Sequence, residues 1–291
     1  MSRTRFSLIT TCRGRLHHVR ETLPLMAAQP DVEVILVDDA CPDGTGNWVE
    51  ANFPGVKVVR SHSENAFNLA RARNIGVGAA SAEWLLFVDA DVRIEPGWID
   101  WMRVNVEPGR FYWIEADPQG RRNRDLFGTL ICHRSDFAAL EGYDEVFQGW
   151  GGEDSDLKER LVINGVKEDF FPARFISAIP HSDRERAGWS GMADRAQKHL
   201  LIQCYKLAKA QVARLQAQGT PLSLDIRQSL WDFTAGSISQ WCNSDMSQPL
   251  KIHYRLVDGV GRPVSQPYAL RAALVLEVAI THAEAAQLAN S

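Results

Sequence analysis

The sequence has no apolar run long enough to cross a bilayer, because stretches such as residues 84–88 are far shorter than the roughly 20 residues required. Its N-terminus carries arginines but no apolar core after them, so we expect no signal peptide. It also lacks a lysine- or arginine-rich run and has a formal net charge of −4, which disfavours nucleic acid as the main partner. We therefore expect a cytoplasmic protein, with contact at a membrane surface left open.

Cysteine is scarce and scattered. The five residues are an odd number and include no Cys-x-x-Cys pair, which argues against a disulfide framework or a structural zinc site. We therefore expect reduced thiols at all five positions. These are Cys12, Cys41, Cys132, Cys204 and Cys242.

The overall composition is that of a folded protein. Hydrophobic residues make up 45% and charged residues 23%, which excludes a disordered or fibrous chain. A length of 291 residues is at the upper limit of what one hydrophobic core supports. We therefore expect one large domain with an appendage.

The first 90 residues alternate short apolar runs with amphipathic segments, a pattern typical of a parallel α/β sheet. The runs at 32–37 and 84–88 are almost continuously apolar, as expected of central strands covered by helices on both faces. We predict strands at 6–10, 32–37, 56–59 and 84–88, and helices at 16–28, 43–51 and 65–80, the last capped by Asn65.

Four carboxylates follow predicted strands: Asp38 and Asp39 after the second, Asp89 and Asp91 after the fourth. Right-handed crossovers bring the carboxyl ends of parallel strands to one edge of the sheet, where ligands bind. Clustered carboxylates repel one another unless neutralised, and their oxygens suit Mg²⁺ or Mn²⁺ shared with a diphosphate. In an extended backbone Asp89 and Asp91 would project to the same side. Each pair by itself could instead form a turn or cap a helix.

Three segments resemble nucleotide-sugar glycosyltransferases of the GT-A fold, especially glycosyltransferase family 2. They are Val37-Asp-Asp-Ala-Cys-Pro-Asp-Gly-Thr45, Ala70-Arg-Ala-Arg-Asn-Ile-Gly76 and Phe87-Val-Asp-Ala-Asp-Val92. The resemblance implies a GT-A (Rossmann-like) mixed, mainly parallel sheet flanked by helices, and a UDP-sugar as donor. One departure is Ala40-Cys41, where Gly-Ser is common in the family. It changes the turn chemistry but removes no ligand.

The same resemblance implies roles for individual residues. Thr11 and Asp39, or Asp38 in its place, would hold the uracil and ribose of the donor. Asp89 would meet the ribose or the donor sugar, and Asp91 would bind the metal. The further donor-binding candidates are Arg13, Arg71 and Arg73.

The segment from Gly142 to Leu157 interleaves glycines with Trp150 and then opens a helix with an acidic run. Acidic residues are favoured at a helix N-terminus by the helix dipole, and glycines permit tight turns, so one interpretation is purely structural. Against it, an exposed tryptophan between glycines is unfavourable unless something stacks on it, and aromatic faces commonly cover sugar rings. We therefore favour a functional loop.

This segment closely resembles the Trp-Gly-Gly-Glu-Asp motif of β-1,4-galactosyltransferases and of related chondroitin-type and polypeptide N-acetylgalactosaminyl enzymes. The resemblance implies that Asp154 is the catalytic base and that Glu153 hydrogen-bonds the acceptor or donor sugar. Trp150, Gly151 and Gly152 would belong to a loop that closes over the donor. Such chemistry needs a carboxylate to take the proton of the attacking hydroxyl and a metal to stabilise the departing diphosphate.

His181 is the candidate for a second metal ligand. Galactosyltransferase-like enzymes carry a metal-binding histidine at a similar distance beyond the acidic loop, often with methionine three residues earlier. Here the earlier position is Ala178, so the ligand set would be shorter, and the choice between Mn²⁺ and Mg²⁺ stays open. The alternative is that His181 is a surface or packed residue.

The resemblance covers roughly residues 4–186, which we expect to form the catalytic domain (1–186), with further strands at 111–116 and 126–132. Residues 187–219 would contain a long amphipathic helix packed on that domain. Residues 220–291 would form a small α+β appendage with strands at 250–257 and 273–280. The oligomeric state is open.

The leading hypothesis is an inverting, metal-dependent glycosyltransferase that moves a sugar from a UDP-sugar to a hydroxyl of a saccharide or other glycan acceptor. A first alternative is a catalytically inactive scaffold that binds sugar or nucleotide on the same fold. A second is a sugar-nucleotidyltransferase, which needs a Gly-rich phosphate loop after the first strand. Residues 11–15 are only a faint approximation to such a loop.

Overall fold

The computed structural model describes residues 6–62, 67–147, 151–180, 195–215, 221–244, 248–256 and 272–278. The chain forms two compact units, residues 1–191 and residues 192–291. Three of the residues singled out above, Asn65, Trp150 and His181, lie outside the described residues.

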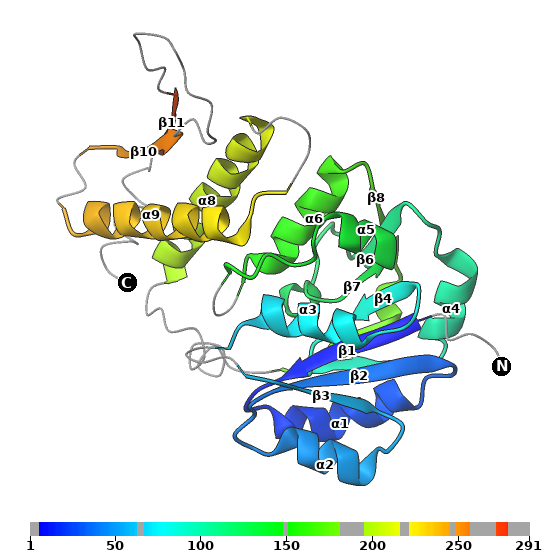
Figure 1. Ribbon diagram of the computed structural model, residues 1–291. Helices are drawn as coiled ribbons and strands as arrows, with labels where there is room; N and C mark the ends of the chain where they lie inside the picture. The colour runs from blue at the N-terminus through cyan, green and yellow to red at the C-terminus, as the bar shows by residue number, and fades with distance from the viewer. Residues whose placement is uncertain are drawn as a thin grey trace, which may run out of the picture. The chain divides into compact units, whose positions relative to one another are not determined.

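The first unit is built on a mixed sheet. Its strands are β1 (Phe6–Cys12), β2 (Val32–Asp39), β3 (Lys57–Ser61), β4 (Trp84–Phe87), β6 (Arg110–Ile114), β7 (Leu130–His133) and β8 (Lys167–Phe171). They lie in the order β3-β2-β1-β4-β7-β6-β8 (Figure 1). The first four in this order are parallel, β7 is antiparallel to both of its neighbours, and β8 is parallel to β6. The expected mixed, mainly parallel sheet is confirmed.

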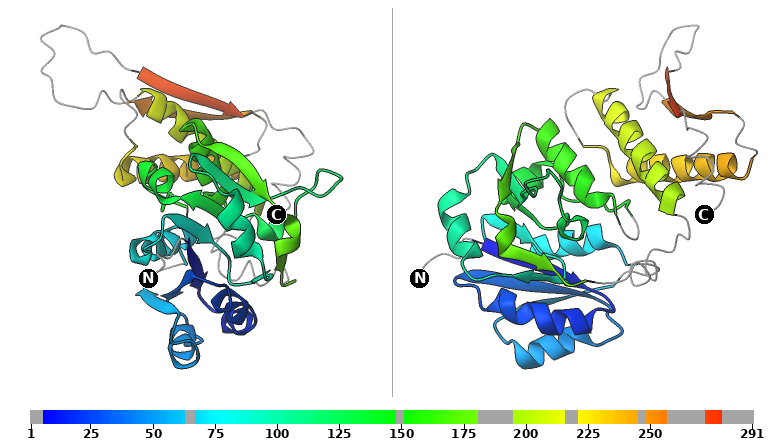
Figure 2. Two further views of the ribbon diagram at one scale, coloured as in Figure 1. Left: turned by 90° about the vertical axis from the view of Figure 1, so that its right-hand side faces the viewer. Right: turned by 180° about the vertical axis from the view of Figure 1, so that it is seen from behind.

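Helices cover both faces of this sheet. One face carries α1 (Leu16–Ala27), α2 (Thr45–Asn52) and α4 (Trp98–Asn105), and the other carries α3 (Leu69–Ala79), α5 (Arg134–Ala139) and α6 (Glu153–Ile163). Figure 2 shows α1 and α2 on one side of the sheet and α6 on the other. Along β1, Leu8 packs into the first layer and Ile9 into the second. Burial of both faces explains why the runs at 32–37 and 84–88 are almost continuously apolar.

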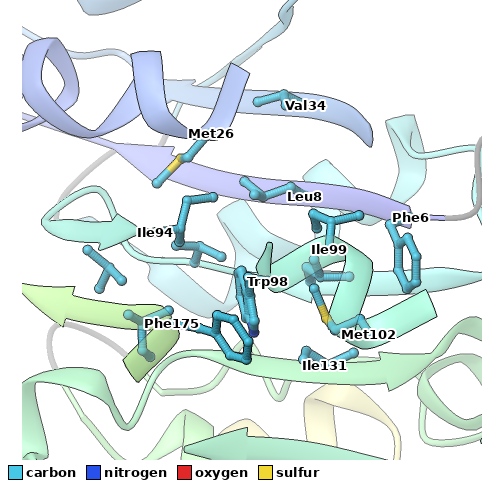
Figure 3. Packing of buried hydrophobic residues seen from close by; sticks show 14 of the residues in the cluster. Phe6, Leu8, Met26, Val34, Ile94, Trp98, Ile99, Met102, Ile131 and Phe175 are labelled. Atoms are coloured by element: carbon cyan, nitrogen blue, oxygen red, sulfur yellow. The ribbon is translucent and has the colours of Figure 1, made fainter. Parts of the chain in front are cut away.

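The first layer holds the largest cluster of fully buried side chains (Figure 3). Met26 from α1 and Trp98, Ile99 and Met102 from α4 lie around Leu8 of β1, and each has 0% of its surface exposed. Burying a side chain of this size stabilises the fold by about 1.5–3 kcal/mol. This layer therefore provides a rigid base for the strand ends at the carboxyl edge of the sheet.

The structure corrects three local predictions. Helix α3 begins at Leu69, and its N-cap is Asn68, whose side chain accepts a hydrogen bond from Arg71 N at 2.9 Å. Strand β7 begins at Leu130, because the preceding residues form the 3₁₀ helix η1 (Arg124–Leu126). Residues 89–91 form a turn closed by Val92 N donating to Asp89 O at 3.1 Å, so the extended backbone expected there was wrong.

A second, two-stranded sheet begins immediately after that turn. Strand β5 (Val92–Ile94) pairs antiparallel with β9 (Ile176–Ala178), which follows the 3₁₀ helix η2 (Ala173–Phe175). Val92 lies opposite Ala178 in this register. The pairing brings the chain that leads to His181 beside the segment that follows Asp91 in sequence.

The second unit combines two helices with a hairpin. Helix α8 (Arg195–Leu215) packs against α9 (Leu224–Cys242), with the rings of Tyr205 and Trp231 in an edge contact at 5.2 Å. Strands β10 (Leu250–Leu256) and β11 (Ala272–Val278) form the antiparallel pair expected at 250–257 and 273–280. Packing of the 187–219 helix on the catalytic domain stays a prediction. Within the described part of the chain, no helix combines the length and apolar character needed to cross a membrane.

Candidate functional site

The carboxyl edge of the sheet gathers the predicted strand-end residues. Strand β1 lies between β2 and β4, and Cys12 at its end is the register partner of Asp38. Asp39 ends β2, and Asp89 follows two residues after the end of β4. The expected convergence of these strand ends on one edge is therefore confirmed.

A buried arginine from α3 links this edge to α6. The side chain of Arg73 is 2% exposed, and its Nη2 donates to Asp89 Oδ1 at 2.7 Å. Its Nη1 donates to Asp154 Oδ1 at 2.5 Å and lies 3.5 Å from Glu153 Oε1. The guanidinium also lies over the ring of Tyr143, 5.0 Å from its centroid. One cation thus joins the first aspartate of the Asp-x-Asp segment to both acidic residues of the Trp-Gly-Gly-Glu-Asp segment.

The two acidic residues at the start of α6 differ in their environment. Glu153 is 3% exposed, whereas the side chain of Asp154 is 21% exposed. Burial, reinforced by the charge of Asp154, raises the pKa of Glu153 to about 8 although Arg73 opposes the shift. Burial disfavours the charged form of Arg73 as well, but the carboxylates of Asp154 and Asp89 raise its pKa above the ordinary value. At neutral pH the cluster therefore holds one cation, two carboxylates and one protonated carboxylic acid.

The glycines before α6 have a conformational role. Gly151 and Gly152 have φ values of 94° and 101°, which side chains with a Cβ rarely adopt. Gly152 is the N-cap residue, so this backbone places Glu153 and Asp154 in the first helical turn. The helix dipole favours negative charge there. The structural interpretation of these two glycines therefore holds, and it serves the positioning of the acidic pair.

A second buried cation lies one helical turn beyond Asp154. Lys158 Nζ donates to the carbonyl of Phe127 at 2.9 Å and lies 3.9 Å from the centroid of the Trp113 ring. Burial lowers its pKa, while the charge of Asp154 works in the opposite direction. Lys158 was not predicted from the sequence, because no motif marks a lysine that folds back over an aromatic ring.

The Arg-Asn-x-Gly part of α3 positions the acidic segment. Asn74 Nδ2 donates to the carbonyl of Tyr143 at 2.9 Å, and Asn74 Oδ1 accepts from Tyr143 N at 2.9 Å. Asn68 Nδ2 donates to the carbonyl of Glu145 at 2.7 Å. A Cβ on Gly76 would lie 2.5 Å from Ile9 Cγ2, so glycine allows the helix to approach the sheet closely. Asn68 and Asn74 therefore hold the backbone of residues 143–145, which precede α6, in place. This role was not predicted from the sequence.

Gly128 completes the surroundings of Arg73. A Cβ at this position would lie 2.8 Å from Arg73 Nη2 and still closer to Asp89 Oδ2. The site therefore requires glycine here for space. No sequence pattern marks this glycine, because the contact arises from the antiparallel insertion of β7 beside β4.

The two adjacent aspartates at the end of β2 have different partners. Asp38 accepts hydrogen bonds from Cys41 N at 2.7 Å, Gly46 N at 2.6 Å and Arg60 Nη1 at 3.0 Å. It holds the turn that leads into α2. Asp39 instead accepts from Arg13 Nη1 at 3.3 Å and Ser61 Oγ at 2.6 Å. Of the two candidates for the donor nucleotide, Asp39 is therefore the one that pairs with a second candidate, Arg13.

Thr11 and Arg71 are the remaining donor candidates. Thr11 is a buried residue of β1, next to Cys12. Arg71 is exposed and donates to the carbonyl of His62 at 3.2 Å, so Arg73 rather than Arg71 lies among the carboxylates. Sequence spacing alone left both arginines as candidates.

Of the two candidate metal ligands, Asp91 is among the described residues and His181 is not. Ile179 lies two residues before His181 in the sequence, and its backbone N donates to the backbone carbonyl of Asp91 at 2.8 Å. In the described part of the chain, no group of three or more histidine, cysteine or acidic side chains is arranged to hold a metal ion. The backbone pairing therefore relates Asp91 to the segment that precedes His181, and the role of His181 stays a prediction.

Sequence comparison finds two adjoining glycosyltransferase segments. Residues 7–102 match the family described as Glycosyl transferase family 2, and residues 115–182 match the N-terminal domain of galactosyltransferase. Beta-1,4-galactosyltransferase 2 of Mus musculus is 31% identical over 122 residues, covering 39% of this chain and 32% of that protein. The chain thus aligns with about a third of the length of this curated relative.

Solved structures with low sequence identity share the fold. S. aureus TarS (residues 1–349, in complex with UDP-GlcNAc) gives a TM-score of 0.58 at 16% identity, covering 84% of this chain and 74% of that chain. GalNAc-T7 with UDP, GalNAc and Mn²⁺ gives a TM-score of 0.55 at 16% identity, covering 85% and 59% respectively. The chain therefore has the fold of these GT-A glycosyltransferases, and two of its segments match glycosyltransferase family models.

Proposed function

We propose that the protein is an inverting, metal-dependent glycosyltransferase that moves a sugar from a UDP-sugar to a hydroxyl of a saccharide or other glycan acceptor. The observation that carries this proposal is the bridge from Asp89 through Arg73 to Asp154. It joins the strand end where the donor sugar would lie to the helix start where an acceptor hydroxyl would be deprotonated. The bridge joins the two segments that match glycosyltransferase families, since Arg73 and Asp89 lie in the first segment and Asp154 lies in the second.

The donor nucleotide would lie over the ends of β1 and β2. Arg13 and Asp39 form an ion pair there, and Thr11 precedes them on β1. Asp39 would accept a hydrogen bond from the base or ribose, while Asp38 keeps the underlying turn in shape. The UDP and UDP-GlcNAc held by the two structural neighbours support a uridine nucleotide.

Asp154 would act as the general base. Arg73 holds its Oδ1, while part of the side chain remains exposed and can meet an acceptor. The acceptor hydroxyl would give its proton to this carboxylate as its oxygen attacks the anomeric carbon. Attack from the face opposite the nucleotide inverts the configuration at that carbon.

Glu153 would contribute as a neutral acid. Because its pKa is raised to about 8, it carries a proton at neutral pH and can donate a hydrogen bond to a sugar hydroxyl. Its Oε2 is buried without a hydrogen-bond partner among the described residues. A sugar hydroxyl would satisfy this atom, which is otherwise left unpaired at a cost of about 1–3 kcal/mol.

The donor set of the site fits a hard divalent cation. At neutral pH two carboxylates, Asp89 and Asp154, share the single charge of Arg73, and Asp91 adds a third carboxyl group nearby in sequence. Mn²⁺ or Mg²⁺ prefers such oxygen ligands, and Asp91 with His181 would hold it. When bound, the cation would neutralise the charge that develops on the leaving diphosphate. The Mn²⁺ in the GalNAc-T7 structure supports this assignment.

The inactive-scaffold alternative predicts no requirement for a pre-oriented base. The arrangement of Arg73 between Asp89 and Asp154 therefore favours an enzyme. A sugar-nucleotidyltransferase is disfavoured because both family matches are to glycosyltransferases.

The test of the proposed function is UDP release from a panel of UDP-sugars, with and without Mn²⁺, and with a series of monosaccharide and disaccharide acceptors. We expect metal-dependent release from one donor, accelerated by one acceptor, with an inverted linkage by NMR of the product. Binding of UDP and Mn²⁺ without release from any donor would favour the scaffold. Retained anomeric configuration would overturn the base assignment.

The metal assignment has its own test. His181→Ala should raise the Mn²⁺ concentration needed for half-maximal UDP release, whereas His199→Ala, at an exposed position of α8, should leave it unchanged. An equal metal requirement in the wild type and both variants would remove His181 from the ligand set.

A further inference from the structure

Two cysteines that are far apart in the sequence meet at the carboxyl edge of the sheet. Cys12 is the last residue of β1, and Cys41 lies two residues beyond the end of β2. Their sulfur atoms are 3.9 Å apart. A disulfide requires about 2.05 Å between sulfurs, so a small rotation or shift of the turn would bring the two into bonding distance.

The two thiols differ in access and in charge. Cys41 is half-buried, while Cys12 is 1% exposed. Hydrogen bonds from Cys12, from Thr45 and from the amide of Gly14, the largest from Cys12, together lower the pKa of Cys41 to about 5 despite partial burial. The same contact, together with burial, raises the pKa of Cys12. These surroundings therefore favour the thiolate form at Cys41 and the thiol form at Cys12.

Two protein groups lie within hydrogen-bond distance of the Cys41 sulfur. Gly14 N donates to Cys41 Sγ at 3.1 Å, and Thr45 Oγ1 lies 3.0 Å from it. Thr45 Oγ1 also accepts from Cys12 Sγ at 3.5 Å. Such donors stabilise a thiolate, which is the reactive form of cysteine towards oxidants.

We propose that Cys12 and Cys41 form a reversible dithiol–disulfide site whose oxidant is a hydroperoxide. The Cys41 thiolate attacks one peroxide oxygen, the O–O bond breaks, and the departing hydroxide takes up a proton to become water, which leaves a sulfenic acid on Cys41. Cys12 then loses its proton and attacks this sulfur, the S–O bond breaks, and a second water leaves. Two thiols are oxidised by two electrons, and hydrogen peroxide is reduced to two waters. A small dithiol would reverse the reaction by thiol–disulfide exchange.

The disulfide would change the surroundings of Arg13 and Asp39. Oxidation removes the thiolate that accepts from Gly14 N and draws the turn after β2 towards the end of β1. The Arg13–Asp39 ion pair spans the same two strand ends. We therefore expect oxidation to weaken UDP binding by roughly fivefold or more. This consequence depends on the proposed function, whereas formation of the disulfide does not.

The experiment treats the folded protein with hydrogen peroxide and follows intact mass, free-thiol count and peptide maps. We expect the loss of two of the five thiols, a Cys12–Cys41 cross-link in the map, and full recovery with dithiothreitol. Cys12→Ser should stop at a sulfenic acid on Cys41 that a dimedone probe traps, and Cys41→Ser should block the reaction. Cys132→Ser, at a fully buried thiol, should behave as the wild type. Oxidation of Cys41 no faster than that of Cys242, or no cross-link in the wild type, would overturn the proposal.

Titration calorimetry with UDP tests the effect of the disulfide on donor binding separately from formation of the disulfide. Weaker UDP binding by oxidised wild type, restored by dithiothreitol and absent in peroxide-treated Cys41→Ser, supports control of the donor site. A disulfide that leaves UDP affinity unchanged overturns that control. Failure of the reduced protein to bind UDP would overturn the proposed function. Formation of the disulfide would then be judged from the peptide maps alone.

Discussion

Arg73 donates a hydrogen bond of 2.5 Å to Asp154 while its other terminal nitrogen donates to Asp89, so one buried guanidinium connects residues 65 positions apart in the sequence. A carboxylate held by such a fork has a defined orientation. The proposed transfer would use the part of this side chain that stays exposed.

Removal of the bridging cation should destabilise the fold and abolish activity. Arg73→Ala leaves Glu153, Asp154 and Asp89 next to one another without compensation, which costs about 3–5 kcal/mol for a buried pair. Urea unfolding measures the loss. Arg71→Ala is the matched control, because Arg71 is exposed on the same helix and should change stability by about 0.5 kcal/mol or less. Equal effects of the two substitutions would contradict the bridge.

The proposed base can be removed with little change of shape. Asp154→Asn should lower kcat by roughly 10²–10⁴-fold while UDP affinity stays close to that of the wild type. Asp156→Asn is the control, because Asp156 lies on the same helix but pairs with Arg160 at 2.7 Å. It should lose stability rather than turnover per folded molecule. Substantial activity in Asp154→Asn would refute the assignment of the base.

The protonated state of Glu153 predicts a pH dependence of stability. Its pKa rises from the ordinary 4.5 to about 8 in the folded protein, so between these values the native state binds one proton more than the unfolded state. The free energy of unfolding then falls with rising pH by up to ~1.4 kcal/mol per pH unit from this residue. Glu153→Gln keeps the neutral shape and removes this contribution.

The measurement is the difference in unfolding free energy between Glu153→Gln and wild type, from about pH 5 to about pH 8. The variant should become steadily more stable relative to the wild type as the pH rises. A difference that does not depend on pH would show that Glu153 is already ionised in the folded protein.

The space beside Arg73 can be tested with two glycines. The Cβ of Gly128→Ala would displace the Asp89 carboxylate and Arg73, which costs about 1–3 kcal/mol and should raise KM for the donor. Gly78→Ala lies on α3 with no atom within 4 Å of the new Cβ, so it should stabilise the protein by about 0.5–1 kcal/mol. Thermal unfolding and donor kinetics compare them. Wild-type kinetics in Gly128→Ala would mean that this space is not needed for function.

The adjacent aspartates of β2 should separate stability from binding. Asp38→Asn loses charge-assisted hydrogen bonds from two backbone amides and Arg60, so we expect a loss of about 1–3 kcal/mol in stability. Asp39→Asn keeps an acceptor for Ser61 and should mainly weaken UDP binding. Denaturation curves measure the loss of stability, and titration calorimetry measures UDP binding. Weaker UDP binding in Asp38→Asn and lower stability in Asp39→Asn would exchange the roles of the two aspartates.

Local patterns were sufficient for much of the first unit. The strands ending at Cys12 and Asp39 and the helix starting at Leu16 follow from apolar runs and amphipathic spacing, which depend on neighbours in the chain. Local signals misplaced the cap of α3 at Asn65 because two asparagines, Asn65 and Asn68, precede that helix. They also missed α9, although Leu230, Thr234 and Ile238 recur at helical spacing.

The sequence by itself determined the chemistry available at the edge of the sheet: the aspartates after the strands, the acidic start of α6 and the glycines that precede it. Only the tertiary structure decided which of these groups meet. Strand order brings Cys12 next to Cys41, β7 brings Gly128 against Asp89, and the packing of α6 beside α3 brings Asp154 to Arg73. Contacts between segments depend on sheet order and burial across the whole unit, and no local spacing encodes them.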